Sequence, residues 1–257
     1  MKHILVCVKA VPVSSSVEVD GQHRLKRDGA SLQWNIADES ALEAAFRLAD
    51  RDGSVTVLTM GPPKLEGPLL ELLARGANRA VLITDRLMAG ADTRATARAL
   101  ASAAALGPFD AVFCGCKAID GETGQVPGEL AAALGLPCIS NAEKVEAAGD
   151  GLLVTRRLED GVQNLTVSGS AMVSFSSYSY PLRLAGILGM RRARKTPVEI
   201  LTAADLGLTP EDCGLKGSLT KVVAMESRFP GLRRGPKETD LDAGVQNLRV
   251  LLREVRP

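Results

Sequence analysis

The chain has 257 residues, 46% of them hydrophobic, and its 31 basic residues almost balance 30 acidic ones. This composition allows a sizeable buried core. The net charge is only +1, so the chain lacks the broad excess of basic residues that is typical of proteins that bind nucleic acid or anionic membranes. No secretory signal and no membrane span is expected, because no run approaches roughly 20 apolar residues.

Short apolar runs alternate with alanine-rich amphipathic segments along the first 140 residues. The expected strands are 3–11, 54–61, 79–84, 109–115 and 137–140, and the expected helices are 38–51, 65–76, 92–105 and 123–135. Alternation of strand and helix with short connections predicts an α/β fold. It is a Rossmann-like, mostly parallel sheet with helices on both faces.

From about residue 142 the pattern changes to a period of two, with turn signals at GDG (149–151) and EDG (159–161). We expect antiparallel strand additions to the sheet, followed by an apolar strand at 171–176. Residues 181–257 contain no obvious βαβ unit and end in a short amphipathic helix at 240–257. The predicted division is therefore an α/β domain at 1–180 and a C-terminal arm at 181–257. Such an arm lies on a partner chain or on its own body.

The cysteines are Cys7, Cys114, Cys116, Cys138 and Cys213. Their number is odd and several lie in apolar runs, so we expect buried free thiols in a reducing compartment, the cytoplasm. The spacing of Cys114 and Cys116 is not CxxC, and no second pair completes a zinc site. We expect no metal site and no catalytic set, because neither histidine has a nucleophile near it in the sequence.

The expected strands end in loops that carry unusual residues. These loops are KAVP, MGPP, TDRLMAGADT and GCKAIDGETGQ, and they leave the edge of a parallel sheet at which ligands bind. Gly121 and Gly124 would allow close approach of a phosphate or nucleotide, and amides at a helix start favour negative charge. Thr123 and Gln125 add hydrogen-bonding side chains. The last loop is a candidate phosphate cradle, or alternatively a glycine-rich turn that caps a helix; it matches neither common nucleotide fingerprint.

Three further segments each allow a functional and a plain interpretation. In NIADESALEAA, Asn35 would hydrogen-bond an adenine or ribose edge, or would simply cap the helix that follows. The same alternatives hold for AGADT (89–93). The basic run MRRARKTP (190–197) follows an apolar segment, so it is a docking element or a solvated charged face. Nucleic-acid binding is not expected there, since no aromatic platform accompanies the charge.

Eight segments in this order resemble the beta (small) subunit of electron transfer flavoprotein. They are VCVKAVP, WNIADESALEAA, VTVLTMGPP, ARGANRAVLITD, AGADTRATA, GCKAIDGETGQVPGELAAALGLP, VTRRLEDGVQNL and RRARKTPVEILTAADLGL. The compact AIDGETGQV most resembles the electron-bifurcating group of that family. The sequence departs from the usual pattern at Cys116 and Lys117, where an Arg-Gln pair is usual, and at Ser170, where a proline is usual.

The resemblance implies a heterodimer with a larger alpha subunit that holds an FAD. In bifurcating members the beta subunit binds a second FAD that takes hydride from NADH. One electron then goes to ferredoxin or flavodoxin, and the other goes through the alpha-subunit FAD to an acyl-CoA-type or related dehydrogenase. In non-bifurcating members the beta subunit holds a structural AMP and scaffolds the alpha subunit. A more distant alternative is a stand-alone nucleotide-binding stress-type protein.

The resemblance also implies functional residues. The cofactor contacts would be Cys7, Lys9, Asn35, Ile36, Ala37, Asp38, Met60, Gly115, Cys116, Lys117, Ala118, Ile119, Asp120, Gly121, Glu122, Thr123, Gly124, Gln125 and Val126. The candidates for the nicotinamide-nucleotide side are Gly90, Asp92 and Thr93. The docking segment toward the dehydrogenase would contain Ile187, Leu188, Met190, Arg191 and Arg192, and the arm would wrap the alpha subunit.

Overall fold

The computed structural model describes residues 3–13, 18–19, 25–26, 31–49, 53–223 and 239–254. The chain divides into two compact units, Met1–Val223 and Ala224–Pro257, and each is described by itself. The strands of the main sheet are β1 (His3–Cys7), β6 (Ser54–Met60), β7 (Arg79–Ile83), β8 (Ala111–Gly115), β9 (Cys138–Ala148), β10 (Gly151–Leu158), β11 (Gly161–Val167), β12 (Ala171–Phe175) and β13 (Glu199–Leu201). The helices are α1 (Ile36–Leu48), α2 (Glu66–Arg75), α3 (Thr93–Ala104), α4 (Val126–Leu134), α5 (Ile187–Ala193), α6 (Gly214–Gly217) and α7 (Leu241–Glu254).

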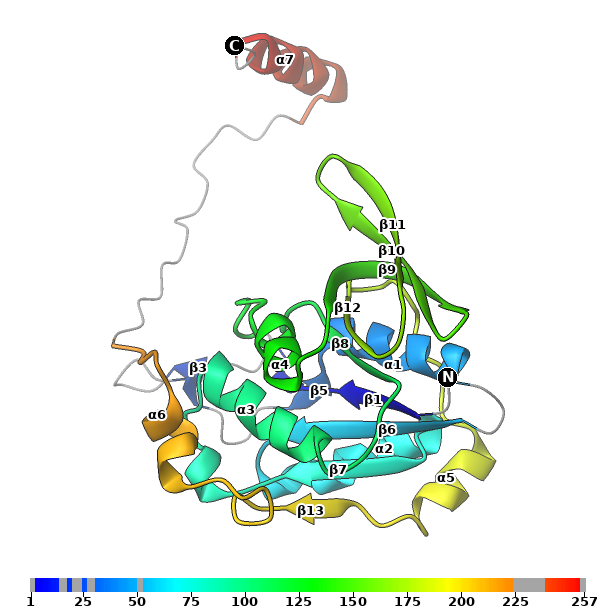
Figure 1. Cartoon of the computed structure of the whole chain (residues 1–257). Coiled ribbons are helices and arrows are strands. Elements are labelled where there is room, and N and C mark those ends of the chain that lie inside the picture. The colour runs from blue at the N-terminus through cyan, green and yellow to red at the C-terminus, as the bar shows by residue number, and fades with distance from the viewer. Residues whose placement is uncertain are drawn as a thin grey trace. The chain divides into compact units, whose positions relative to one another are not determined.

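The first unit is built on a nine-stranded sheet in the order β11-β10-β9-β12-β8-β1-β6-β7-β13 (Figure 1). Strand β1 pairs in parallel with β6 and β8, β6 with β7, and β8 with β12. The predicted α/β architecture is therefore confirmed. Because β1, β6, β7 and β8 are parallel, the four loops that follow them leave one edge of the sheet.

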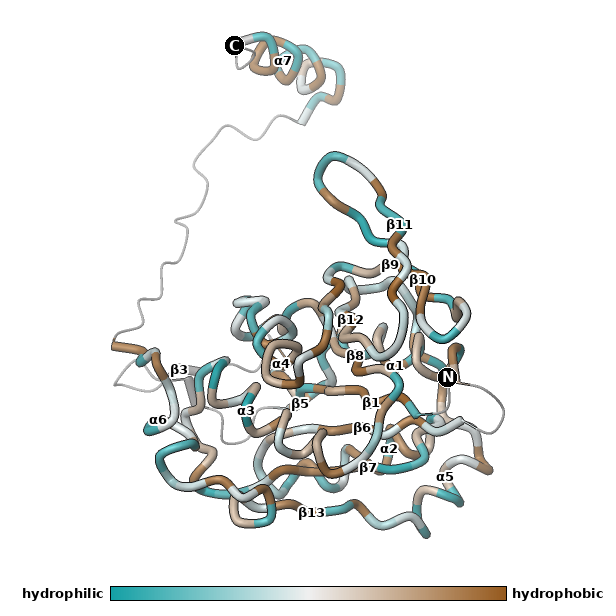
Figure 2. The backbone as a smooth tube through the Cα atoms, in the orientation of Figure 1, coloured by the Kyte–Doolittle hydropathy of each residue, from teal (hydrophilic) through white to brown (hydrophobic). Residues whose placement is uncertain are grey.

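Helices cover both faces of this sheet, as predicted. Buried residues of β1, β6 and β8 pack with α1 and α2 on one face and with α3 and α4 on the other. Figure 2 shows hydrophobic residues along the central strands. The core is aliphatic apart from a few rings, such as Phe113 and Phe175, whose centroids are 5.0 Å apart. Parallel strands buried on both faces favour such Val, Ile and Leu-rich segments.

The period-two region forms the antiparallel addition that the sequence predicts. Strand β9 begins parallel to β12 and continues antiparallel to β10, which pairs antiparallel with β11. The fifth short strand predicted at 137–140 is thus the beginning of an 11-residue strand. Two smaller antiparallel pairs join β2 (Ala10–Pro12) with β5 (Leu32–Trp34) and β3 (Glu18–Val19) with β4 (Leu25–Lys26).

Residues 181–223 belong to the first unit, so the compact units do not divide at residue 181. Strand β13 pairs with β7 at the sheet edge, and α5 packs against α2. The Arg183 guanidinium also pairs with the buried Glu43 carboxylate of α1 at 2.9 Å. Strand β13 carries no periodic signal, because it has only three residues and Ile200 within it is exposed.

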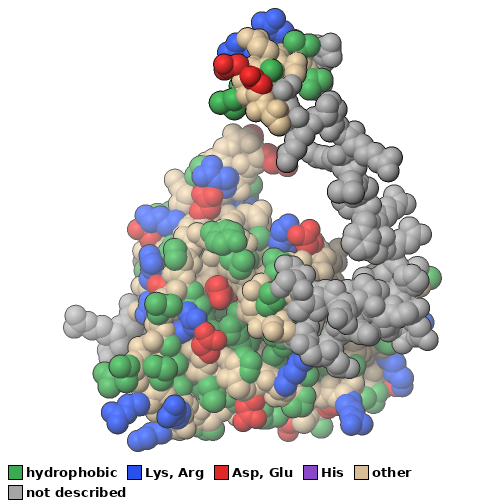
Figure 3. Space-filling view, turned by 180° about the vertical axis from the view of Figure 1, so that it is seen from behind, with side chains coloured by type: hydrophobic (Ala, Val, Ile, Leu, Met, Phe, Trp, Pro, Cys, Tyr) green, Lys and Arg blue, Asp and Glu red, His purple; other side chains and the backbone are tan. Residues whose placement is uncertain are grey.

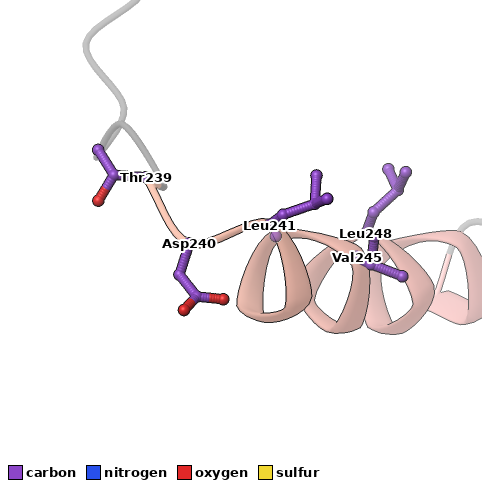
Figure 4. A pocket seen from close by; sticks show the side chains of 6 residues that line it. Thr239, Asp240, Leu241, Val245 and Leu248 are labelled. Carbon is purple, nitrogen blue, oxygen red and sulfur yellow. The ribbon is translucent and has the colours of Figure 1, made fainter.

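The second unit contains α7, which confirms the amphipathic helix expected near the C-terminus. Its exposed apolar side chains include Leu241, Val245 and Leu248. Figure 4 shows that Leu241 and Leu248 point to the same side of the helix, where they help to line a shallow hollow. Among the described helices, none is both long and apolar enough to cross a membrane.

Candidate functional site

One buried carboxylate connects the ends of two central strands. Asp38, in the first turn of α1, is 5% exposed. Its Oδ2 accepts a hydrogen bond from the Lys9 amide just after β1 at 2.8 Å, and its Oδ1 accepts one from the Gly115 amide at the end of β8 at 2.7 Å. Asp38 therefore supports the carboxyl edge of the sheet from inside.

Burial controls the ionisation of this region. It raises the pKa of Asp38 to about 7, although hydrogen bonds from the Lys9 and Gly115 amides act in the opposite direction. Burial, followed by the negative charge of Asp38, raises the pKa of Cys7 to about 12. Burial likewise raises the pKa of Cys114. Both thiols stay protonated near neutral pH, so neither supplies a thiolate nucleophile.

Asn35 supports the same edge through its side-chain amide. It is 1% exposed, its Nδ2 donates to the Lys117 carbonyl at 2.9 Å, and its Oδ1 accepts from the Ile119 amide at 3.3 Å. Its side chain caps no amide of α1. Instead of capping the helix, it holds the loop after β8 from beneath. We call Asn35 and Asp38 the anchor residues.

Residues 115–126 form the loop held by the anchor residues, which we call the cradle loop. Residues 119–125 are exposed. The backbone adopts positive φ at Glu122 (52°) and Gly124 (63°), and the Cys116 amide donates to the Phe175 carbonyl of β12 at 2.8 Å. A Cβ added at Gly121 would meet nothing within 4 Å. The loop therefore presents open backbone at the carboxyl edge of the sheet.

The cradle loop leads into the start of α4. Gln125 is the N-cap residue, but its side chain caps no amide. The first N–H groups of a helix have no partner within the helix, and the helix dipole favours an anion there. Beside the loop, the Lys9 ammonium pairs with Asp120 at 2.7 Å. Pro127 at the second helical position has no N–H, so the amides of Val126 and Gly128 are the ones that fit the phosphate groups of a nucleotide.

Thr93 brings the start of α3 to this helix. Its hydroxyl lies 3.1 Å from Gln125 Oε1 and 3.1 Å from Glu129 Oε1. Glu129 has a second carboxylate oxygen that is buried and has no partner among the described residues. Glu129 was not predicted from the sequence. Its position one turn after the start of α4, beside the predicted cradle, was the signal that could have identified it.

The other residues predicted for the nicotinamide side lie differently. The carboxylate of Asp92 is engaged by residues 219 and 220 of the same chain, and Gly90 faces Leu215 of α6. The structure thus places Thr93 beside the cradle loop, whereas the side chain of its neighbour Asp92 binds residues 219 and 220.

The remaining predicted cofactor residues line the edge at different depths. Met60 and Ile36 are partly buried, whereas Cys7 and Ala37 are buried. A Cβ at Gly115 would stand 2.6 Å from the Ala37 Cβ, so this strand end must be glycine for α1 to pack closely. The buried residues shape the site from below.

The predicted docking segment forms α5. Ile187 and Leu188 are 73% and 80% exposed, and Figure 3 shows hydrophobic and basic side chains side by side at this end of the first unit. Arg192 differs from the other basic residues, because its guanidinium donates to the Leu73 carbonyl of α2 at 3.0 Å. It fastens α5 to α2. Met190 and Arg191 are exposed.

No cluster of three or more potential metal ligands occurs within the described residues. One of the two histidines, His23, lies outside them. The exposed part of the cradle loop carries hydrogen-bonding groups and charge, but no cysteine or histidine. The site is therefore suited to bind and orient a ligand.

The comparisons with known proteins identify a family for the chain. The electron transfer flavoprotein domain matches residues 24–206. The electron transfer flavoprotein subunit beta of Thermoanaerobacterium thermosaccharolyticum is 41% identical over 251 residues, covering 96% of each chain. Protein FixA of Azorhizobium caulinodans is 39% identical (93% of this chain, 88% of FixA), and subunit CarD of the caffeyl-CoA reductase-Etf complex of Acetobacterium woodii is 36% identical (85% of each). The chain therefore belongs to the electron transfer flavoprotein family, among its beta subunits.

Proposed function

We propose that this beta subunit binds FAD at the cradle loop, in a heterodimer with an electron transfer flavoprotein alpha subunit. A bound FAD would supply the redox chemistry, namely oxidation of NADH with delivery of electrons to ferredoxin or flavodoxin and, through the alpha-subunit FAD, to a dehydrogenase. The chain's own residues bind and orient the nucleotide.

The observation that carries this proposal is the exposed cradle loop on its two buried anchor residues. Asn35 fixes the backbone at Lys117 and Ile119, and Asp38 fixes Gly115. A loop anchored in this way keeps its amides oriented before a ligand arrives, which lowers the entropic cost of binding. The uncapped start of α4 would receive the pyrophosphate, with Thr93 and Gln125 beside it.

The name of one relative supports the class of partner. CarD is named as a subunit of a caffeyl-CoA reductase-Etf complex, which favours a dehydrogenase that acts on acyl-CoA compounds. All five cysteines of this chain are free, which supports a reducing compartment, the cytoplasm.

The decisive experiment is cofactor analysis of the heterodimer purified after co-expression with its alpha subunit. Two flavins per heterodimer, with bleaching of the flavin absorbance by NADH under anaerobic conditions, are expected. One flavin together with acid-extractable AMP would overturn the proposal and assign the subunit to the non-bifurcating, scaffolding class.

Substitutions test whether the cradle loop is the binding site. Asn35→Ala removes both side-chain bonds to the loop, and the double change Thr123→Ala, Gln125→Ala removes two exposed polar groups. Both variants should lose beta-site nucleotide while keeping the alpha-subunit flavin. Thr166→Ala, an exposed hydroxyl on β11, is the matched control and should keep full occupancy. Full occupancy in both cradle variants would contradict the assignment.

A further inference from the structure

The carboxylate of Asp92 holds a segment far away in the sequence. Its Oδ2 accepts hydrogen bonds from the amides of Leu219 (2.8 Å) and Thr220 (2.9 Å) and from the Thr220 hydroxyl (3.1 Å). The Asp92 amide in turn donates to the Ser218 hydroxyl at 2.8 Å. We call this set of bonds the Asp92 clasp. It joins parts of the chain that are 126 to 128 residues apart.

The backbone on both sides is shaped for close contact. A Cβ at Gly214 would stand 2.3 Å from the Leu87 carbonyl oxygen, and one at Gly90 would stand 2.7 Å from Leu215. The Ser218 hydroxyl also donates to the Gly214 carbonyl at 2.7 Å. The segment that ends the first unit is therefore seated directly on the loop before α3.

Asp92 has two separable tasks. Its Oδ1 accepts from the Ala95 amide at 3.0 Å and so caps α3, while its Oδ2 makes the clasp. Partial burial alone would raise the pKa of Asp92, but hydrogen bonds from the amides of Ala95, Thr220 and Leu219 and from the Thr220 hydroxyl hold it at about 2. The carboxylate is ionised throughout the physiological range and accepts these bonds as a charged group.

We propose that Asp92 is a positioning residue that fixes the point at which the chain leaves the sheet unit, without contacting the nucleotide. The first unit ends at Val223, shortly after the clasp. The next residue along α3, Thr93, faces the start of α4 at the cradle loop. Asp92 and Thr93 are adjacent in the chain, but Asp92 contacts the end of the first unit and Thr93 contacts α4.

The functional consequence rests on the proposed function. If the beta subunit passes electrons within a heterodimer, the clasp keeps Leu219 and Thr220, near the end of the first unit, in the conformation that the assembled complex uses. Loss of the clasp should therefore impair the assembled complex and leave binding of nucleotide unchanged.

Asp92→Asn separates the two tasks. Asparagine is as good an N-cap residue as aspartate, so the bond to Ala95 is kept, but its NH₂ group cannot accept from three donors. Thr220→Val is a second, milder variant that removes the hydroxyl donor alone. The matched control is Asp205→Asn, because the Asp205 carboxylate also accepts from an amide and a hydroxyl, both of nearby Thr202.

The first measurement is hydrogen exchange of residues 215–223 in the full heterodimer. Asp92→Asn should speed exchange of the Leu219 and Thr220 amides by about tenfold or more, a factor that corresponds to about 1.4 kcal/mol, with a smaller effect in Thr220→Val. Asp205→Asn should leave these amides unchanged. Unchanged protection in Asp92→Asn would overturn the proposal whichever cofactor the subunit binds.

The second measurement is steady-state electron delivery from NADH to the dehydrogenase. Asp92→Asn should keep its flavin content and its KM for NADH, and should lose kcat or affinity for the partner. A raised KM for NADH with lost flavin would instead place Asp92 in the nucleotide site and overturn the positioning role. If wild type itself holds AMP, only the proposed bifurcating function fails, because the exchange measurement still stands.

Discussion

Replacing Asp38 by asparagine should make the protein more stable above neutral pH while it weakens the site. Burial raises the pKa of Asp38 from 3.8 to about 7, a shift of about 3 units that corresponds to about 4 kcal/mol. The folded state binds the proton more tightly than the unfolded state. This contribution to stability is complete below pH 3.8 and is lost as the pH rises through about 7.

The side chain introduced by Asp38→Asn is a neutral stand-in for the protonated acid, so the variant should lack this pH dependence. The unfolding free energy of wild type should fall relative to that of the variant by about 1.4 kcal/mol per pH unit between about pH 4 and 7, and the difference should then level off. The cost to the site is separate. The new amide has a single acceptor oxygen, so the backbone N–H of either Lys9 or Gly115 loses its buried partner, at about 1–3 kcal/mol.

Denaturant unfolding of both proteins at four values between about pH 5 and 8 measures the difference directly, since the other titrating groups are shared. The amount of bound nucleotide, measured at the highest of these pH values, shows whether the substitution weakens the site. We expect a variant that is more resistant to denaturant under mildly alkaline conditions but poorer in bound nucleotide. A difference in unfolding free energy that stays constant across this range would refute the reasoning about the buried carboxylate.

Alanine substitutions at two closely packed glycines give further predictions. Gly115→Ala would place a Cβ 2.5 Å from Asp38 Oδ1, so it should cost about 1–3 kcal/mol and lower the thermal unfolding midpoint; an unchanged midpoint would contradict this. Gly189→Ala would place a Cβ 2.0 Å from the Ala74 carbonyl oxygen, so α5 should move off α2 and binding of the dehydrogenase should weaken in a pull-down, whereas full retention of the partner would count against a docking role for α5. Gly161→Ala, at the start of β11 and with nothing within 4 Å of the added Cβ, is the control for both.

The sheet and its helices were predictable because each long element carries its own periodic signal. The strands at β1, β6, β7 and β8 are continuous apolar runs, and α3 begins at a capping aspartate as its sequence indicates. Strand β13 and helix α5 were not predictable, because they are short and their stability comes from packing on β7 and α2. The expected division at residue 181 does not coincide with the compact units for that reason.

The position of the candidate site was predictable, but the tasks of its residues were not. The parallel topology places the cradle loop at the carboxyl edge, as expected. The sequence could not show that Asn35 and Asp38 point inward, since their partners lie 82 and 77 residues away. It also could not show that Asp92 and Thr93, adjacent in the chain, serve different contacts.

Because Asn35 and Asp38 are buried, the residues that fix the backbone of the cradle loop are different from those that would select its ligand. The side chains that hold the loop backbone are buried, whereas the residues that would contact a nucleotide are exposed. The exposed residues can therefore be substituted without loss of the hydrogen bonds that hold the loop. An engineer who wished to exchange one adenine cofactor for another would therefore randomise positions 121–125 and leave Asn35 and Asp38 untouched.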